Sequence, residues 1–145
     1  MTDLPFKRLD PDAMLPERAH PGDAGLDLRS IVDIEIRPAE RAMVPTGLSV
    51  AIPEGHAGLV LPRSGLASKR GLTLSNAPGL IDAGYRGEVV CAVVNLDPNE
   101  AVKIARGDRI AQLVIVRIPE VEPSWVDELP SSRRGEGGFG STGTN

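Results

Sequence analysis

Glycine and proline interrupt this chain so often that it favours many short strands over long helices. Its 145 residues include sixteen glycines and thirteen prolines, which recur throughout instead of collecting in one linker. Between them lie short runs rich in β-branched residues, which are typical of strands. The runs cover residues 31–36, 42–52, 59–61, 88–96, 101–104 and 109–118. This pattern, in a chain of single-domain length, predicts an all-β sandwich or barrel.

One short helix is predicted at residues 64–70. Ser64 is suited to cap its start, and Gly71 lies just past its end, where glycine commonly ends a helix. From about Pro119 the apolar pattern decays, and residues 133–143 are rich in Gly, Ser and Thr. Such a terminal segment is typical of a disordered tail.

Charge and cysteine content argue against several classes of partner. The net charge is −4 and no run of Lys or Arg occurs, so we expect no nucleic-acid partner. Cys91 is the only cysteine and lies in an apolar run, which predicts a buried structural thiol. His20 and His56 are far apart in the sequence and give a zinc site little support. The chain shows no signal pattern and no apolar stretch of membrane length, so we expect a cytoplasmic protein without a membrane partner.

Two of the expected strands are apolar on both faces. Residues 89–94 and 110–118 carry apolar side chains at nearly every position, and such strands require cover on two sides. One domain of this size provides little cover of that kind, which favours an oligomer.

The glycine-rich stretch at residues 76–88 combines a carboxylate, Asp82, with an aromatic ring, Tyr85. Glycines at this density let a backbone approach a ligand closely. The chain contains only four aromatic residues, so one placed in a turn region favours ligand contact over a core role. By itself, the stretch is more typical of an ordinary hairpin with a solvated Asp82 and a packing Tyr85.

Residues 62–71 carry groups suited to an anion. Arg63, Ser64 and Gly65 stand at the expected helix start, where free amides and the helix dipole favour phosphate and a guanidinium adds a charge-assisted contact. A plain capped helix is the alternative for this segment.

Three further features allow both a functional and a structural interpretation. Asp23 and Asp27 could hold Mg²⁺ through water, or serve only as turn residues. Residues 134–143 are similar to a phosphate-cradling loop with Phe139 as an aromatic lid, but they lack the Gly-Lys-Ser/Thr of a Walker motif. Gln112, in an otherwise apolar strand, needs a partner in the protein or in a ligand.

Five segments together resemble the five ordered motifs of the trimeric deoxyuridine triphosphatases (dUTPases). They are residues 24–30, 62–71, 79–88, 107–114 and 134–143, in the family's order and across nearly the whole chain. The resemblance implies a jelly-roll-like β-sandwich or barrel with one short helix, assembled as a homotrimer. It also implies a β domain at residues 1–124 and a flexible arm at 125–145 that closes over a neighbouring subunit's active site.

The implied reaction is hydrolysis of dUTP to dUMP and pyrophosphate, which keeps uracil out of DNA and supplies dUMP for thymidylate synthesis. Asp82 is implied as the general base that activates a water for in-line attack on the α-phosphorus. Mg²⁺ is the implied cofactor, chelated by the triphosphate and held through water by Asp27. The implied phosphate contacts are Arg63, Ser64, Gly65 and Gln112, with Arg134 of the arm on the γ-phosphate.

The same resemblance assigns residues to the base and the sugar. Residues 76–81, with Asn76, Gly79 and Ile81 among them, are implied to read uracil through backbone groups and to leave no space for a 5-methyl group. Tyr85 is implied to pack against the deoxyribose and to exclude a 2′-hydroxyl. The arm is implied to cover the uracil with Phe139, and to add the substrate contacts Gly140 and Ser141.

Two rival functions remain for comparison. A deoxycytidine triphosphate deaminase, a relative with the same fold, needs a glutamate in the strand after the hairpin, where this chain has Ala92. A non-catalytic trimeric β module is expected to have lost the catalytic carboxylate and the C-terminal arm, yet Asp82, Tyr85 and residues 134–143 are all present. The enzyme interpretation is therefore favoured.

Overall fold

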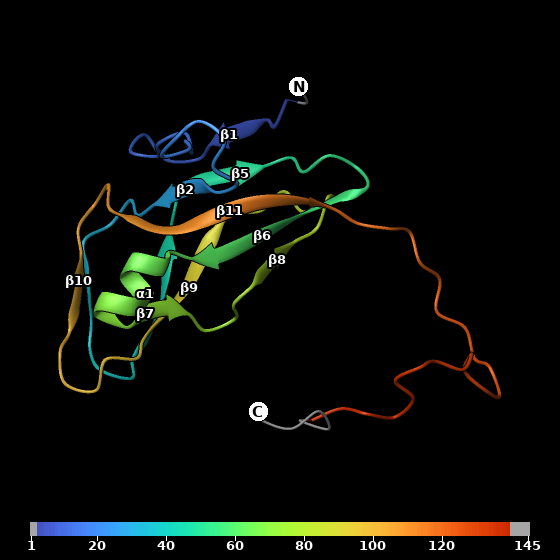
Figure 1. Cartoon of the computed structure of the whole chain (residues 1–145). Coiled ribbons are helices and arrows are strands. Elements are labelled where there is room, and N and C mark those ends of the chain that lie inside the picture. Colours follow the sequence, from blue (N-terminus) through green and yellow to red (C-terminus); the bar gives the residue numbers. More distant parts are fainter. Residues whose placement is uncertain (1–2, 140–145) are drawn as a thin grey trace.

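The computed structural model describes residues 3–139 and shows a mostly β chain with one short helix (Figure 1). The first strands are β1 (Phe6–Arg8), β2 (Leu26–Arg29), β3 (Ile34–Ile36), β4 (Arg41–Pro45), β5 (Leu48–Val50) and β6 (His56–Pro62). After helix α1 (Ser64–Arg70) come β7 (Leu72–Leu74), β8 (Gly79–Ile81), β9 (Val90–Asn95), β10 (Val102–Ile104) and β11 (Arg109–Arg117). The expected all-β class is confirmed.

Two main sheets share one apolar core. The first has the order β2-β11-β6-β8 and the second β4-β9-β7, with the pairs β1-β5 and β10-β3 beside them. All the pairings are antiparallel. Leu28 and Leu113 from the first sheet and Val44 and Val93 from the second are completely buried in a common cluster. Burial of such side chains is the main stabilising term of the domain.

The register of the four-stranded sheet divides its residues between two faces. One row joins Gly79 on β8, Val60 on β6 and Leu113 on β11, and all three residues are buried. The next row joins Leu61 on β6, Gln112 on β11 and Asp27 on β2, all partly exposed. Because successive strand residues point to opposite faces, the first row faces the core and the second row lies on the outer face.

The prediction of a single run at residues 42–52 is wrong in one respect. Two strands, β4 and β5, occupy it, and they pair with β9 and β1 respectively. Gly47 separates them with a φ of +68°, and a Cβ there would lie 2.9 Å from the Cβ of Asp10. The chain therefore turns at a position that only glycine suits.

The helix has the predicted bounds, but its predicted cap is wrong. Ser64 is its first helical residue, and the N-cap is Arg63, in an extended conformation without a side-chain capping bond. The cause is the direct passage from β6, which ends at Pro62, into the helix. Gly71 ends it in the left-handed conformation, as expected. With seven residues, this helix is too short to cross a membrane, and the described part of the chain has no other.

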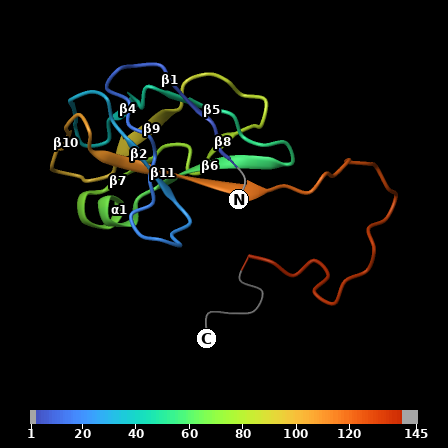
Figure 2. The same ribbon diagram turned by 90° about the horizontal axis from the view of Figure 1, so that it is seen from above.

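The segment after β11 leaves the body of the domain (Figures 1 and 2). The last hydrogen bond to the body runs from the Ile118 amide to the Gly55 carbonyl, at 2.9 Å. Within the described residues, positions 119–139 form no strand or helix, and Trp125 and Phe139 are fully exposed. The division of the chain at residue 124 stays a prediction.

Candidate active site

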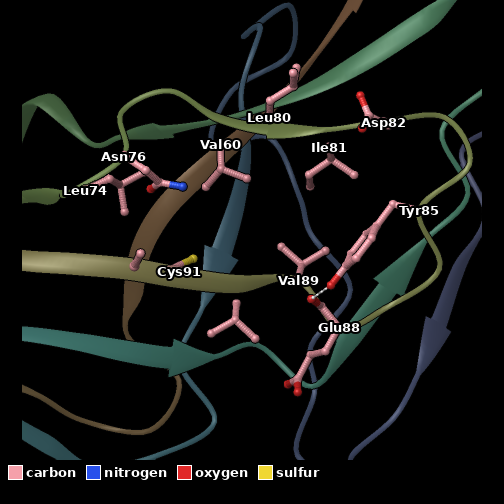
Figure 3. Close-up of a pocket in the computed structure, with 13 residues that line it drawn as sticks. Val60, Leu74, Asn76, Leu80, Ile81, Asp82, Tyr85, Glu88, Val89 and Cys91 are labelled. Atoms are coloured by element: carbon pink, nitrogen blue, oxygen red, sulfur yellow. Dashed lines mark hydrogen bonds between the residues drawn. The ribbon is translucent and has the colours of Figure 1, made fainter.

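A pocket of about 170 Å³ opens between β8 and β9, inside the stretch that the sequence singled out (Figure 3). Asn76, Gly79 and Ile81 line it from the hairpin, and Asp82 and Tyr85 stand at the other end. Apolar walls come from three strands and from the residue before β9: Val60, Leu74, Cys91 and Val89. Drug-sized ligands commonly occupy 300 Å³ or more, so a pocket of this volume suits one small ring with its substituent.

The hairpin brings backbone groups to the pocket wall. Gly79 is buried on β8, and a Cβ there would lie 3.3 Å from the Asn76 amide nitrogen. Asn76 can approach so closely because the glycine has no side chain. The peptide bond between Ala77 and Pro78 is cis. Predicted residues Asn76, Gly79 and Ile81 therefore do lie together.

Asp82 follows directly on β8 and is exposed at the pocket mouth. Its backbone carbonyl accepts a hydrogen bond from the Tyr85 amide at 3.0 Å, which closes a turn over the two residues between them. The carboxylate has no hydrogen-bond or ion-pair partner within residues 3–139 and is therefore open to a water or a ligand. Such an exposed carboxylate beside a small pocket is placed to act as a base.

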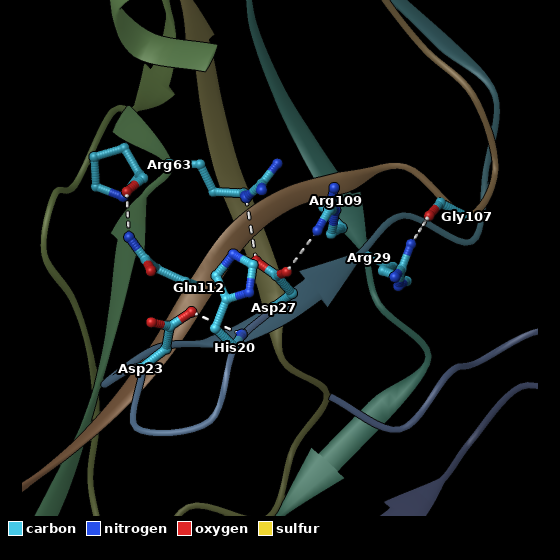
Figure 4. A network of polar contacts seen from close by, with 9 residues as sticks. His20, Asp23, Asp27, Arg29, Arg63, Gly107, Arg109 and Gln112 are labelled. Atoms are coloured by element: carbon cyan, nitrogen blue, oxygen red, sulfur yellow. Dashed lines mark hydrogen bonds and ion pairs between the residues drawn. The ribbon is translucent and has the colours of Figure 1, made fainter. Parts of the chain in front are cut away.

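A second, larger pocket of about 660 Å³ carries the cationic groups. Arg63, Ser64 and Gly65 line it, together with Asp27 and Gln112. The Arg63 Nε lies 3.1 Å from one Asp27 oxygen, and Arg109 Nη1 lies 3.3 Å from the other (Figure 4). The Gln112 amide donates to the Pro62 carbonyl at 3.0 Å, which is the protein partner that this polar side chain needs. Motifs far apart in sequence thus meet around one carboxylate.

Asp27 is a suitable outer partner for a magnesium ion, but not a complete site. Its side chain is only 12% exposed, and both of its oxygens already face guanidinium groups. Among residues 3–139, no three His, Cys, Asp or Glu side chains gather to hold a metal. Mg²⁺ commonly uses one or two carboxylates with waters and substrate phosphates, so Asp27 fits an ion that arrives with a phosphorylated ligand.

Asp23, the other acidic candidate of this region, is a turn residue here. Its carboxylate accepts a hydrogen bond from the His20 backbone amide at 2.9 Å (Figure 4). Its backbone carbonyl accepts one from the Arg18 Nε at 2.7 Å. These contacts close the loop before β2. The structural interpretation of Asp23 is therefore the better one.

The two pockets lie on opposite faces of the four-stranded sheet. Val60 lines the small pocket from the core face, whereas its neighbour Leu61 lines the large pocket from the outer face. No residue lines both. Within one chain, Asp82 and the arginines of the large pocket therefore line different pockets.

Arg134 and Phe139, the candidate residues of the arm that the structure describes, line neither pocket. Arg134 Nε donates to the Gly137 carbonyl at 2.6 Å, inside the arm itself. Phe139 is fully exposed, with a φ of +48°. Gly140 and Ser141 lie outside the described residues.

Two residues near the pockets were not predicted as site residues. Arg109 lies in a segment that resembles a family motif, but its pairing with Asp27 depends on a strand register between residues 82 positions apart. Cys91 was expected to be buried, and it is, but it also lines the small pocket. Burial raises the pKa of its thiol to about 12, so the group stays neutral and forms part of an apolar wall. Ala92 also lines that pocket, at the position where a deaminase needs its glutamate.

Comparisons with known proteins agree on one family. The family model described as dUTPase matches residues 12–143. A deoxyuridine 5'-triphosphate nucleotidohydrolase of Streptomyces coelicolor is 61% identical over 138 residues, which cover 95% of this chain and 75% of that protein. The enzyme of the same name from Mycolicibacterium gilvum is 55% identical over 147 residues and is covered over 96% of its length.

Solved structures are similar over almost the entire chain. The dUTPase of Staphylococcus bacteriophage 80alpha, described with dUpNHpp, has a TM-score of 0.91 at 37% identity, and covers 99% of this chain and 100% of its own. A D95N variant of the dUTPase from phage phi11 of S. aureus has a TM-score of 0.81 at 33% identity, covering 88% of this chain and 98% of its own. Its description reports the coordination of a structural Mg(II) ion.

Proposed function

Because this chain belongs to the dUTPase family, we propose that it hydrolyses dUTP to dUMP and pyrophosphate, with Asp82 as the general base. One observation supports this above all: an exposed carboxylate borders a pocket for one small ring, and a separate pocket carries arginines and an amide. A nucleoside triphosphate needs both kinds of surroundings. The physiological role would be to keep uracil out of DNA and to supply dUMP for thymidylate synthesis, in the cytoplasm.

The small pocket would bind the uracil and the deoxyribose. Backbone groups of residues 76–81, including Asn76, Gly79 and Ile81, would pair with the polar edge of uracil, and mismatched hydrogen bonds would reject cytosine. The close approach of Asn76 to Gly79 supports a tight fit that has no space for a 5-methyl group. Tyr85 would form the wall against the sugar.

Asp82 would take a proton from a water molecule as that water attacks the α-phosphorus in line with the leaving pyrophosphate. Its lack of a protein partner within the described residues supports this role, because the carboxylate is open to water. The water oxygen forms a bond to phosphorus, the bond to the bridging oxygen breaks, and pyrophosphate carries the electron pair away. The chain's share of catalysis is therefore positioning and proton removal.

The large pocket would bind the phosphates. Arg63, the amides of Ser64 and Gly65, and the Gln112 amide would contact phosphate oxygens, and charge-assisted contacts from guanidinium are the strongest of these. Asp27 would hold waters of a Mg²⁺ ion chelated by the triphosphate, and that ion would neutralise phosphate charge. An incoming phosphate would compete with Asp27 for Arg63.

We also propose that residues 1–124 form the catalytic domain and that residues 125–145 act as an arm. Arg134 would reach the γ-phosphate, and Phe139 would cover the uracil with Gly140 and Ser141 beside it. The full exposure of Phe139 and the absence of hydrogen bonds from residues 119–139 to their own body support an arm that works on another subunit.

A homotrimer would bring the two pockets together. Because the two pockets open on opposite faces of a sheet and share no lining residue, Asp82 of one chain would meet a phosphate bound at Arg63 of a neighbouring copy. On β9, Cys91, Val93 and Asn95 are buried whereas Val90, Ala92 and Val94 are only half-buried, so an apolar face remains for such a neighbour.

The direct test is to offer dUTP, dCTP, dTTP and UTP with Mg²⁺ and to measure pyrophosphate and ammonia. We expect pyrophosphate from dUTP alone. Ammonia from dCTP would instead identify a deaminase, despite Ala92. No turnover of any of the four would contradict the proposed enzyme and favour a binding module.

A further inference from the structure

The Tyr85 ring lies directly against the backbone of Gly87. A Cβ built on Gly87 would lie 2.6 Å from the ring Cζ and 2.9 Å from Cε2, and it would also meet the hydroxyl. Real Cβ atoms essentially never come within 3.0 Å of another heavy atom in this way. The position of the ring therefore requires the residue at 87 to have no side chain.

Hydrogen bonds hold the ring and its turn in this position. The Tyr85 hydroxyl donates to the Glu88 carbonyl at 2.9 Å (Figure 3). Arg86 folds back so that its Nη1 donates to the carbonyls of Ala83, at 2.6 Å, and Tyr85, at 2.8 Å. These hydrogen bonds therefore fix the turn at Ala83, Tyr85 and Glu88.

The last residue of this turn and the residue after it are hydrogen-bonded to the body of the domain. The Glu88 carboxylate accepts the Gly47 amide at 2.8 Å, and the next residue, Val89, donates its amide to the Leu48 carbonyl at 2.7 Å. The Thr46 hydroxyl donates to the Val89 carbonyl at 2.6 Å, in a buried position. The wall that Tyr85 forms is therefore anchored through Glu88 to the junction between β4 and β5.

We propose that Gly87 is a positioning residue for substrate binding, which acts through Tyr85. Without a side chain at 87, the ring settles against the backbone, its hydroxyl reaches Glu88, and the sugar wall is in place before the nucleotide arrives. A wall that is already ordered avoids the entropy cost of ordering it on binding. The inference rests on the proposed function in one respect, the role of Tyr85 toward the deoxyribose.

The test compares Gly87→Ala with Gly84→Ala, a change of the same size in the same turn. A Cβ on Gly84 meets nothing within 4 Å, so it serves as the matched control. Binding of dUpNHpp, the imido analogue of dUTP, is measured by calorimetry together with KM and kcat for dUTP. We expect Gly87→Ala to weaken binding and raise KM about tenfold or more with a smaller effect on kcat, and Gly84→Ala to stay within about twofold.

The deciding measurement repeats Gly87→Ala in a Tyr85→Ala background. If Gly87 acts only through the ring, the second substitution adds no further loss of binding there. An equal loss in both backgrounds would overturn the inference, as would wild-type binding by Gly87→Ala. Tyr85→Phe, which keeps the ring and the glycine, should weaken binding by a smaller factor, and unchanged binding would refute the hydroxyl anchor even if Gly87→Ala failed to fold.

The two proposals fail separately. If the wild-type protein binds dUpNHpp but does not turn over dUTP, the proposed function is contradicted. The binding measurements on Gly87→Ala in the wild-type and Tyr85→Ala backgrounds would then still test the role of Gly87. A wild-type protein that does not bind the analogue would contradict both.

Discussion

At the scale of single residues, the Gln112 side chain depends on Gly25, the residue directly before β2. A Cβ on Gly25 would lie 3.0 Å from Gln112 Cδ and closer still to its amide oxygen. Gln112 lies in the large pocket, with its amide nitrogen on the Pro62 carbonyl. Gly25 therefore makes room for the amide that would contact phosphate.

We predict that Gly25→Ala displaces Gln112 and weakens dUTP binding with little loss of stability, because the crowded atoms belong to the end of a flexible side chain. The expected increase in KM is about tenfold, the size of one lost hydrogen bond to a charged group. Gln112→Ala should cause a similar increase, and the double variant no more than Gln112→Ala alone. A fully additive double variant would contradict the link between the two residues.

The sequence predicts candidate residues better than it predicts their contacts. Gln112 could be predicted as a candidate because an amide in an apolar strand needs a partner. Asp82 could be predicted because its carboxylate lies in a glycine-rich turn region. Arg109 did not stand out, since its contact with Asp27 arises only when β11 lies beside β2. Polar residues in unusual surroundings are visible in a sequence, whereas pairings across a sheet depend on register.

At the scale of the elements, Asn95 joins the end of β9 to two other parts of the chain. It is completely buried, and its amide nitrogen donates to the carbonyls of Ile36, at 3.0 Å, and Glu100, at 2.8 Å. Its side-chain oxygen accepts the Asp97 amide at 2.9 Å. One side chain thus ties β9 to β3 and closes the turn toward β10.

We predict that Asn95→Leu lowers the free energy of unfolding by about 3 kcal/mol, because one buried and two partly buried backbone groups lose their partners. The melting temperature should fall by roughly 6–12 °C for a chain of this size. Asn99→Ala, at an exposed position of the same turn, should change stability by less than about 0.5 kcal/mol. Equal melting temperatures for Asn95→Leu and the wild type would show that the Asn95 side-chain hydrogen bonds contribute nothing to stability.

The arm supplies the second prediction at this scale. Deleting residues 133–145 should reduce kcat/KM for dUTP by about 100-fold or more, since it removes Arg134 and the aromatic lid. The oligomeric state of the full chain and its melting temperature should be retained, because the described residues after Ile118 make no hydrogen bond to their own body. Full activity of the truncated protein would refute the role of the arm.

Element types were predictable from the sequence, while breaks within apolar runs were not. The helix at residues 64–70 was found because glycine and a change of pattern bound it on both sides. The run at 42–52 contains two strands, because Gly47 turns the chain inside a mostly apolar segment. Ser64 has the residue type of a cap, yet Arg63 takes that position, since β6 leads straight into the helix.

At the scale of the whole molecule, the sheet that positions the site also divides it. Val60 and Leu61 are neighbours in β6, and yet they line different pockets. Composition and motif order could suggest an oligomer and a shared site, but could not show which candidate residues share a face. That separation follows from the alternation of a strand once its register is known.

This separation predicts that two inactive variants restore activity to each other. Asp82→Asn removes the proposed base from the small pocket, and Arg63→Ala removes a proposed phosphate contact from the large one, so each pure variant should turn over dUTP slowly. If every site combines the two pockets from different chains, random co-refolding of equal amounts should leave about one quarter of the sites with both pockets intact. The measurement is dUTP hydrolysis before and after co-refolding, with each variant refolded alone as the control. An activity near one quarter of the wild type supports a site shared between subunits, and an activity no greater than the mean of the separate variants would place the whole site within one chain.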